Sequence, residues 1–143
     1  MKTYLFDVNV LLALTWPDHI HHHCVHQWWS KHQQITWATC MLTQLGFIRI
    51  SCHPKFTNNP TTPDIARTSL SRMIEREDHR FWAEPQDGMS NGTFMTKISQ
   101  AKGHSGITDA YLAALAELHG GRLATLDKAL AKIHREVTEL IEN

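Results

Sequence analysis

Residues 3–14 read TYLFDVNVLLAL, an apolar run that contains one carboxylate, Asp7, and one side-chain amide, Asn9, two positions later. Aromatic and β-branched residues at its start predict a short buried strand, and the residues after Asp7 predict a helix. A charge placed in apolar surroundings is costly unless it is paired, hydrogen-bonded or bound to a metal ion. The sequence therefore predicts that Asp7 has partners elsewhere in the chain.

The composition is that of a globular protein. The chain has 143 residues, enough for one domain, and 42% of them are hydrophobic. Fourteen basic and fourteen acidic residues cancel, so the net charge neither indicates nor excludes a nucleic-acid partner. Three cysteines without a CxxC pair favour reduced thiols and a cytoplasmic location. No apolar run approaches the roughly 18 residues that cross a membrane, so we expect no membrane partner.

Strand-like and helix-like segments alternate along the chain. Strands are predicted at residues 2–6, 34–37, 80–83 and 122–126, and helices at 8–14, 20–32, 39–52, from 63 onward, 109–120 and 127–133. We expect a loop at residues 53–63 and a flexible segment at 84–106, which holds four of the seven glycines, whereas 134–143 suits either strand or helix. This alternation predicts an α/β fold around a mainly parallel sheet, in a single domain of residues 1–143.

Three aspartates occupy corresponding places in this pattern. Asp7 follows the first predicted strand, Asp127 follows the strand RLATL, and Asp109 lies in the first turn of an apolar helix for which Thr108 is the predicted N-cap. In parallel sheets, ligands bind beyond the carboxyl ends of the strands. We therefore expect the three carboxylates to meet at one edge of the sheet.

Two interpretations of these carboxylates remain open. Each one, taken singly, suits the N-terminus of a helix, where a capping carboxylate is worth about 0.5–2 kcal/mol. If the carboxylates are clustered, each pair at about 4 Å repels by around 4 kcal/mol at an effective dielectric constant near 20, and a helix cap does not offset this repulsion. A divalent cation offsets it, and oxygen ligands favour Mg²⁺ or Mn²⁺ over Zn²⁺. Such an ion suits hydrolysis of a phosphate ester.

Three segments of this chain resemble a known family. They are DVNVLLAL at residues 7–14, TCMLTQLGFIRIS at 39–51 and ITDAYLAALAELHGGRLATLD at 107–127. Together they look like PIN-domain ribonucleases, and specifically like VapC-type toxins of bacterial toxin–antitoxin pairs. The resemblance covers the whole chain and implies a PIN-like three-layer α/β/α sandwich with a mainly parallel central sheet. It also implies Mg²⁺- or Mn²⁺-dependent endonucleolytic cleavage of RNA, inhibition by a cognate antitoxin protein, and a homodimer.

The resemblance assigns roles to individual residues. Asp7, Asp109 and Asp127 match the first, third and fourth acidic positions of the family, and are the expected metal ligands and catalytic residues. Asn9 matches the polar partner in the first motif. Thr125 matches the hydroxyl residue that often accompanies the last acid.

The second acidic position, usually Glu, is Gln44 in this chain. This departure removes one negative charge, so we expect weaker binding of a second metal ion. Gln44 would then contribute a carbonyl ligand, directly or through water. Arg49, about one and a half turns further along the same predicted helix, either contacts phosphate or neutralises the acidic cluster.

Other functions remain possible from the sequence. The chain could be a catalytically weak PIN-like module that binds RNA or a partner, as Gln44 suggests, or a DNA-directed nuclease of the same superfold, which the short chain disfavours. His22 and His26 have the i,i+4 spacing of metal ligands on a helix. No cysteine or carboxylate completes a tetrahedral site beside them, so we interpret this histidine-rich stretch as an ordinary start of a helix.

Overall fold

A computed structural model describes residues 2–32, 34–56 and 61–142. Its strands form one sheet in the order β3-β2-β1-β4-β5, in which every neighbouring pair is parallel. The strands are β1 (Thr3–Phe6), β2 (Thr36–Thr39), β3 (His79–Phe81), β4 (Arg122–Thr125) and β5 (Thr138–Leu140). The helices are α1 (Val8–Thr15), α2 (His22–Lys31), α3 (Met41–Ser51), α4 (Pro63–Ile74), α5 (Gly92–Gln100), α6 (Ile107–Leu118) and α7 (Lys128–Ile133).

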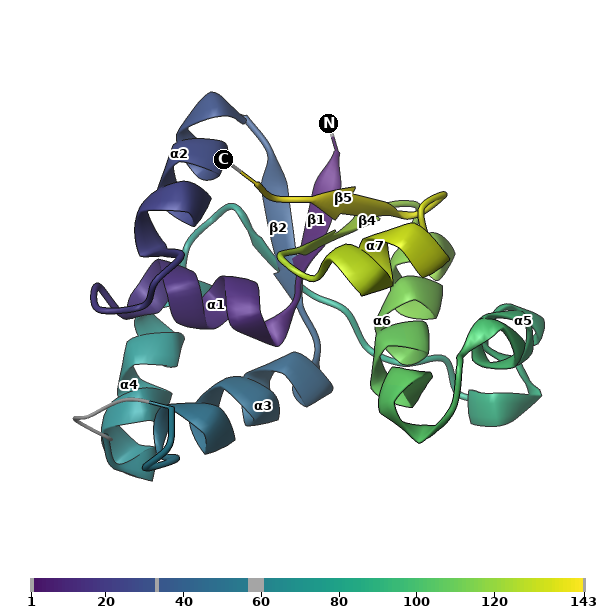
Figure 1. Ribbon diagram of the computed structural model, residues 1–143, viewed down its shortest axis with the longest axis horizontal. Coiled ribbons are helices and arrows are strands. Elements are labelled where there is room, and N and C mark those ends of the chain that lie inside the picture. The colour runs from purple at the N-terminus through teal and green to yellow at the C-terminus, as the bar shows by residue number, and fades with distance from the viewer. Residues whose placement is uncertain (1, 33, 57–60, 143) are drawn as a thin grey trace.

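The helices cover both faces of the sheet (Figure 1). Helices α1 to α4 pack on one face, and α6 and α7 pack on the other, where α5 lies against α6. This arrangement confirms the predicted α/β fold with three layers around a parallel sheet. No helix in the described ranges is long and apolar enough to cross a membrane.

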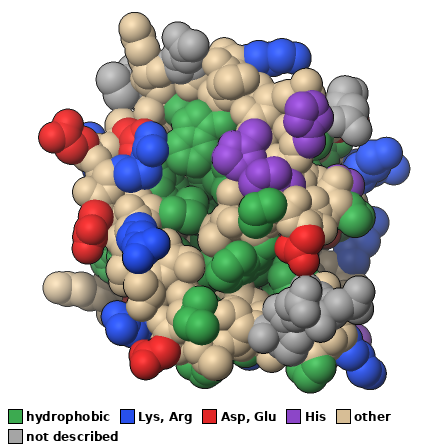
Figure 2. Space-filling view, turned by 90° about the vertical axis from the view of Figure 1, so that its left-hand side faces the viewer, with side chains coloured by type: hydrophobic (Ala, Val, Ile, Leu, Met, Phe, Trp, Pro, Cys, Tyr) green, Lys and Arg blue, Asp and Glu red, His purple; other side chains and the backbone are tan. Residues whose placement is uncertain are grey.

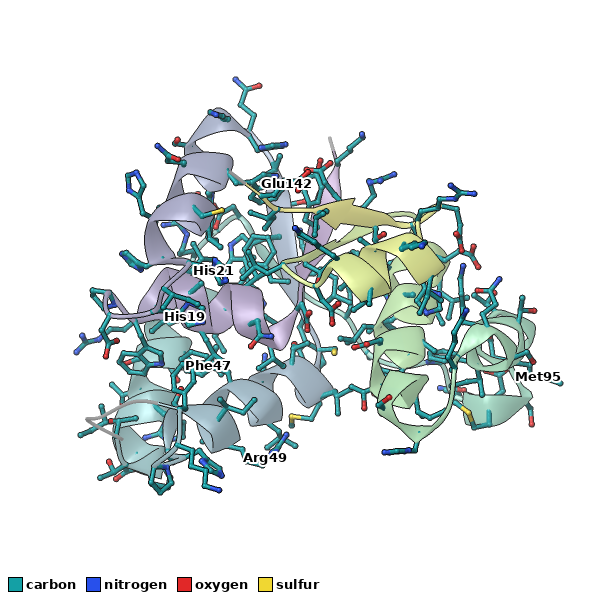
Figure 3. All side chains as sticks on the ribbon, viewed as in Figure 1. His19, His21, Phe47, Arg49, Met95 and Glu142 are labelled. Atoms are coloured by element: carbon teal, nitrogen blue, oxygen red, sulfur yellow. The ribbon has the colours of Figure 1, made fainter. Side chains whose placement is uncertain are left out.

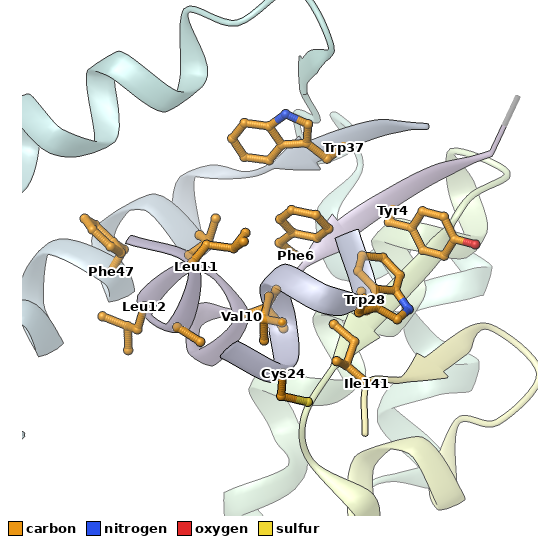
Figure 4. Close-up of a cluster of buried hydrophobic side chains, with 14 of the residues drawn as sticks. Tyr4, Phe6, Val10, Leu11, Leu12, Cys24, Trp28, Trp37, Phe47 and Ile141 are labelled. Carbon is orange, nitrogen blue, oxygen red and sulfur yellow. The ribbon is translucent and has the colours of Figure 1, made fainter. Parts of the chain in front are cut away.

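The central strand β1 is buried on both faces because neighbouring strands flank it and helices cover it. Phe6 faces the α1–α4 layer and stacks on Trp37 with ring centroids 5.3 Å apart (Figure 4). Leu5 faces the opposite layer and belongs to a second core with Leu123 and Leu112. A strand buried on both faces is apolar throughout rather than alternating, which explains the continuous run TYLF.

The order of the strands creates a switch point beside β1. From β1 the chain proceeds outward to β2 and β3, and then crosses to β4 on the other side of β1. In doubly wound sheets such a reversal opens a crevice at the carboxyl ends of the strands. Here the backbone N–H of Asp7 donates to the carbonyl oxygen of Ala124 at 3.1 Å, so the ends of β1 and β4 are joined directly.

Two predictions around helix α6 are wrong. The helix begins at Ile107 with Gly106 as its N-cap, not at Thr108, because a 3₁₀ turn, His104–Gly106, leads straight into it. The segment 84–106, predicted to be flexible, contains helix α5. Asn91 caps α5 by accepting from the backbone N–H groups of Thr93 and Phe94, and the buried Phe94 anchors it in the core.

The remaining ambiguous segments are now assigned. Residues 138–140 form strand β5, which pairs with β4. Of the loop predicted at residues 53–63, residues 57–60 lie outside the described part of the chain.

Candidate active site

Asp7 is held at the N-terminus of α1 by two hydrogen bonds. Its Oδ1 accepts from the backbone N–H of Val8 at 2.7 Å, and its Oδ2 accepts from the hydroxyl of Thr125 at 2.9 Å. The same Thr125 oxygen accepts from the backbone N–H of Asp127 at 3.0 Å. Thr125 is fully buried at the end of β4. It therefore fixes the first aspartate relative to the last.

Asp127 is the N-cap of α7. Its Oδ1 accepts from the backbone N–H groups of Ala129 at 2.9 Å and of Leu130 at 3.1 Å. Its Oδ2 has no hydrogen-bond partner among the described residues, and the side chain is exposed. Asp7 and Asp127 therefore both cap helices, which the sequence left open. Each cap uses one carboxylate oxygen, Oδ1, of the side chain.

Asp109 lies in the first turn of α6 and is half-buried. It forms no hydrogen bond or ion pair with any residue in the described ranges. Burial, followed by the negative charges of Asp7 and Asp127, raises the pKa of Asp109 to about 6. The three aspartates are therefore near enough to repel one another, although they come from distant parts of the sequence.

The pKa of Asp7 is also raised above the ordinary value of an aspartate. Burial is the main cause, and the negative charge of Asp127 adds to it. The hydrogen bonds from Thr125 and from the backbone of Val8 act in the opposite direction because they stabilise the ionised carboxylate. Asp7 thus has protein donors that stabilise its charge, whereas no described residue donates to Asp109.

Gln44 lies in the first turn of α3, at the same end of the sheet. Its Nε2 donates to the hydroxyl of Thr39 at 2.9 Å, and that hydroxyl also contacts Nε2 of His79 at 2.8 Å. Thr39 is the last residue of β2, the strand next to β1. This bond directs the amide nitrogen of Gln44 toward the strand end.

The two other predicted residues are both exposed. Asn9 is exposed in the first turn of α1 and lines a cavity together with Asp127. Arg49 is exposed in the last turn of α3, and Figure 3 shows it on the outer side of that helix. Its contact with phosphate or with the acidic cluster stays a prediction.

The donor chemistry at this edge of the sheet fits a hard divalent cation, but the side chains are not gathered around one point. No Lys or Arg in the described ranges forms an ion pair with Asp7, Asp109 or Asp127. Equally, no three His, Cys, Asp or Glu side chains of the described residues converge closely enough to hold a metal ion. The carboxylates lie near one another with uncompensated charge, and holding an ion requires them to move closer together.

The histidine-rich stretch has a structural role at the other end of α1. His22 Nδ1 lies 2.6 Å from the carbonyl oxygen of Ala13, and His26 Nε2 lies 2.9 Å from that of Leu14. Both rings therefore bond to carbonyls in the last turn of α1, which have no partner within the helix. This agrees with the interpretation of the stretch as an ordinary helix.

Two cavities flank Asp127, and it lines both. The smaller, of about 250 Å³, extends toward Asp109, Lys102 and Ser105. The larger, of about 450 Å³, extends along the connection between α1 and α2 toward Phe56. Neither Lys102 nor Phe56 was singled out from the sequence, because each lies in a segment without regular periodicity and carries no motif. The two cavities thus share one of the three aspartates, Asp127.

Comparison with known proteins gives consistent matches. Residues 4–136 match the family model described as "PIN domain". The chain is 38% identical to ribonuclease VapC39 of Mycobacterium tuberculosis, over 90% of this chain and 91% of the relative. It is 36% identical to ribonuclease VapC38 of the same organism, over 86% and 84% of the two chains. Ribonuclease VapC29 is 35% identical, over 97% and 96%.

Proposed function

Because this chain belongs to the PIN-domain family and, within it, to the VapC ribonucleases, we propose that it is the toxin of a toxin–antitoxin pair. As such it is a Mg²⁺- or Mn²⁺-dependent endoribonuclease that acts in the cytoplasm. Its partners are an RNA substrate, a cognate antitoxin protein and a second copy of itself. The match over residues 4–136 and the single sheet support one PIN domain over residues 1–143.

The observation that carries this proposal is the raised pKa of Asp109. Its value of about 6 follows from burial and from the charges of Asp7 and Asp127, and no Lys or Arg of the described residues forms an ion pair with any of the three aspartates. The fold therefore maintains an electrostatic cost at this edge of the sheet. A bound divalent cation removes that cost, so the arrangement favours an ion-binding site over three independent helix caps.

Asp7, Asp109 and Asp127 would hold the ion, and Gln44 would contribute its carbonyl oxygen directly or through water. Bound there, Mg²⁺ or Mn²⁺ supplies an activated water and neutralises charge on the scissile phosphate. Thr125 holds Asp7 in position, because its hydroxyl donates to Oδ2 and orients the carboxylate. Attack of water on phosphorus breaks the bond to the 3′ oxygen, so the products carry a 5′-phosphate and a 3′-hydroxyl. Because Gln44 is uncharged, we expect a second ion to bind weakly and mainly together with the substrate.

The test is cleavage of a panel of structured and unstructured RNAs by the purified full chain. We expect cleavage with Mg²⁺ or Mn²⁺, none after addition of EDTA, and none for Asp7→Asn. Asp64→Asn, which changes a carboxylate in the first turn of α4, is the matched control and should cleave normally. Metal-independent cleavage, or an active Asp7→Asn variant, would contradict the mechanism.

The second candidate is a PIN-like module that binds RNA or a partner without turnover. Gln44 favours it, because the amide supplies no negative charge at the position that the family resemblance assigns to the second acidic residue. The same experiment separates the two functions. A protein that binds RNA of the panel, yet cleaves none of it with either metal ion, is the binding module.

A further inference from the structure

The larger cavity beside Asp127 has a different chemistry from the acidic site. Its lining includes three rings, those of His19, His21 and Phe56, together with the side chains of Asn9 and Leu126. The ring centroids of His19 and Phe56 are 5.8 Å apart, as are those of His19 and His21. Figure 3 places His19 and His21 beside α1, and Figure 2 shows histidines gathered next to hydrophobic side chains on this face. Flat rings and apolar groups thus dominate this cavity.

The charge of the cavity argues against a phosphate group as its occupant. Two carboxylates, Asp18 and Asp127, line it, and none of the described lining residues is Lys or Arg. The smaller cavity on the other side of Asp127 instead contains Lys102. The smaller cavity also has two carboxylates, Asp109 and Asp127, but Lys102 offsets part of their charge, so a phosphate is repelled more strongly from the first cavity than from the second. The two cavities therefore suit different parts of one ligand.

His19 is held in a form that suits an uncharged ligand with hydrogen-bonding edges. The backbone N–H of His21 donates to Nδ1 of His19 at 3.0 Å, which leaves the ring proton on Nε2. Burial, followed by the nearby His21, lowers the pKa of His19, so its ring is neutral at neutral pH. A neutral ring with one N–H can either stack on the face of a base or donate its N–H, in the plane of the ring, to a carbonyl oxygen or ring nitrogen at the edge of a base.

We propose that this cavity binds an unpaired nucleobase of the RNA, next to the scissile phosphate at the aspartates. The proposal rests on the nuclease function above, and it adds a subsite that selects unstacked, single-stranded RNA. Its support is that Asp127 lines the cavity, that three rings line it, and that none of the described residues lining it is Lys or Arg. Stacking on aromatic rings tolerates any base, whereas the Nε2–H of His19 and the amide of Asn9 can discriminate among bases.

The first test uses the four nucleosides adenosine, guanosine, cytidine and uridine, which have no phosphate, and the full chain carrying Asp7→Asn. We expect at least one nucleoside to shift the NMR resonances of the rings of His19, His21 and Phe56, and to leave the ring of Phe81 unchanged. Inorganic phosphate should leave the three rings unchanged as well. The absence of any nucleoside shift, or a phosphate shift at these rings, overturns the proposal.

The second test uses variants of the lining in the otherwise native chain. Phe56→Leu should lower kcat/KM for cleavage of single-stranded RNA about tenfold, because one stacking surface is lost. Phe56→Tyr should restore it, and Phe81→Leu, at an exposed ring on β3, is the matched control without effect. His21→Ala removes an exposed ring and should weaken cleavage in the same direction without affecting folding.

The outcomes distinguish this proposal from the nuclease function. Normal cleavage by Phe56→Leu and His21→Ala, with no nucleoside shift, overturns the base-binding cavity and leaves the nuclease intact. Nucleoside binding in a protein that cleaves no RNA supports the cavity and overturns the nuclease.

Discussion

Asp7 and Asp127, which follow strands β1 and β4, are held by hydrogen bonds in a way that Asp109, at the start of α6, is not. Asp7 and Asp127 each accept backbone N–H groups at a helix N-terminus, and Thr125 joins them. Asp109 has no such partner within the described ranges, and its pKa is about 6. Protein donors thus fix two of the carboxylates in place, whereas the third has no such partner among the described residues. Under the proposed function, a bound cation would be the partner of the third carboxylate.

The largest expected effect is stabilisation by the metal ion itself. At a free Mn²⁺ concentration about 100 times the dissociation constant, the native chain should gain about 2.7 kcal/mol of unfolding free energy. Asp109→Asn should abolish most of this gain, because it removes the carboxylate without a protein partner. Thermal unfolding with Mn²⁺ and with EDTA measures both. Equal stabilisation of the native chain and the variant would show that Asp109 is no ligand.

The next effect comes from the hydroxyl that joins Asp7 and Asp127. Thr125→Val keeps the shape of the side chain but removes the donor to Asp7 and the acceptor for the backbone of Asp127. We expect a loss of about 1–3 kcal/mol of unfolding free energy, since two partly buried polar groups, on Asp7 and Asp127, lose their partner. The cleavage rate should fall by more than the loss of folded protein explains. Thr125→Ser should restore both the cleavage rate and the unfolding free energy. Urea unfolding and single-turnover cleavage test this, and an unaffected cleavage rate for Thr125→Val would deny Thr125 a positioning role.

A smaller effect concerns pH in the absence of metal. The pKa of Asp109 is about 6 in the folded chain and about 3.9 when unfolded, so between these values the folded state binds the extra proton. The contribution of Asp109 to the unfolding free energy is therefore fully present below about pH 4, and it is lost as the pH rises through about 6. Because Asp109 is half exposed, solvent screening limits this loss to about 1 kcal/mol.

The measurement is urea unfolding in EDTA at about pH 5 and about pH 7.5, chosen to lie on either side of the folded pKa. Asp109→Asn should reduce the pH dependence, and Asp64→Asn should leave it unchanged. A dependence that is identical in the native chain and in Asp109→Asn would place its origin in other groups.

The smallest expected effect separates the cap from the ligand at Asp127. Asp127→Ser keeps a side-chain oxygen for the backbone N–H groups of α7, so unfolding free energy should change by no more than about 0.5 kcal/mol. Cleavage should nevertheless be lost, because the carboxylate is absent. Asp127→Ala, which removes the cap too, should cost about 1 kcal/mol more. Full cleavage by Asp127→Ser would reduce Asp127 to a structural cap.

Local patterns predicted the framework of this chain well. The apolar run at β1 and the strand-to-helix transitions at Asp7 and Asp127 are local features. In each of them, a few neighbouring residues indicate the strand or the position where it ends. Their convergence follows from the parallel sheet alone. The start of α6 at Ile107 was missed, because the 3₁₀ turn before it carries no local signal. Helix α5 was missed, because it is defined by Phe94 packing against α6, a contact that no local pattern contains. The ring-lined cavity was missed for the same reason, since Phe56 and His19 meet only in the folded chain.

The pairing of β4 with β1 also sets the time at which the acidic site exists during synthesis. Leu5 lies opposite Leu123, so the central strand β1, which is synthesised first, cannot pair with β4 until nearly the whole chain has been made. During synthesis, the amino end of the chain leaves the ribosome first. Until residues 122–127 emerge, Asp7 lacks the hydroxyl of Thr125 and the carboxylate of Asp127. A chain interrupted before that point carries the first motif but no complete site.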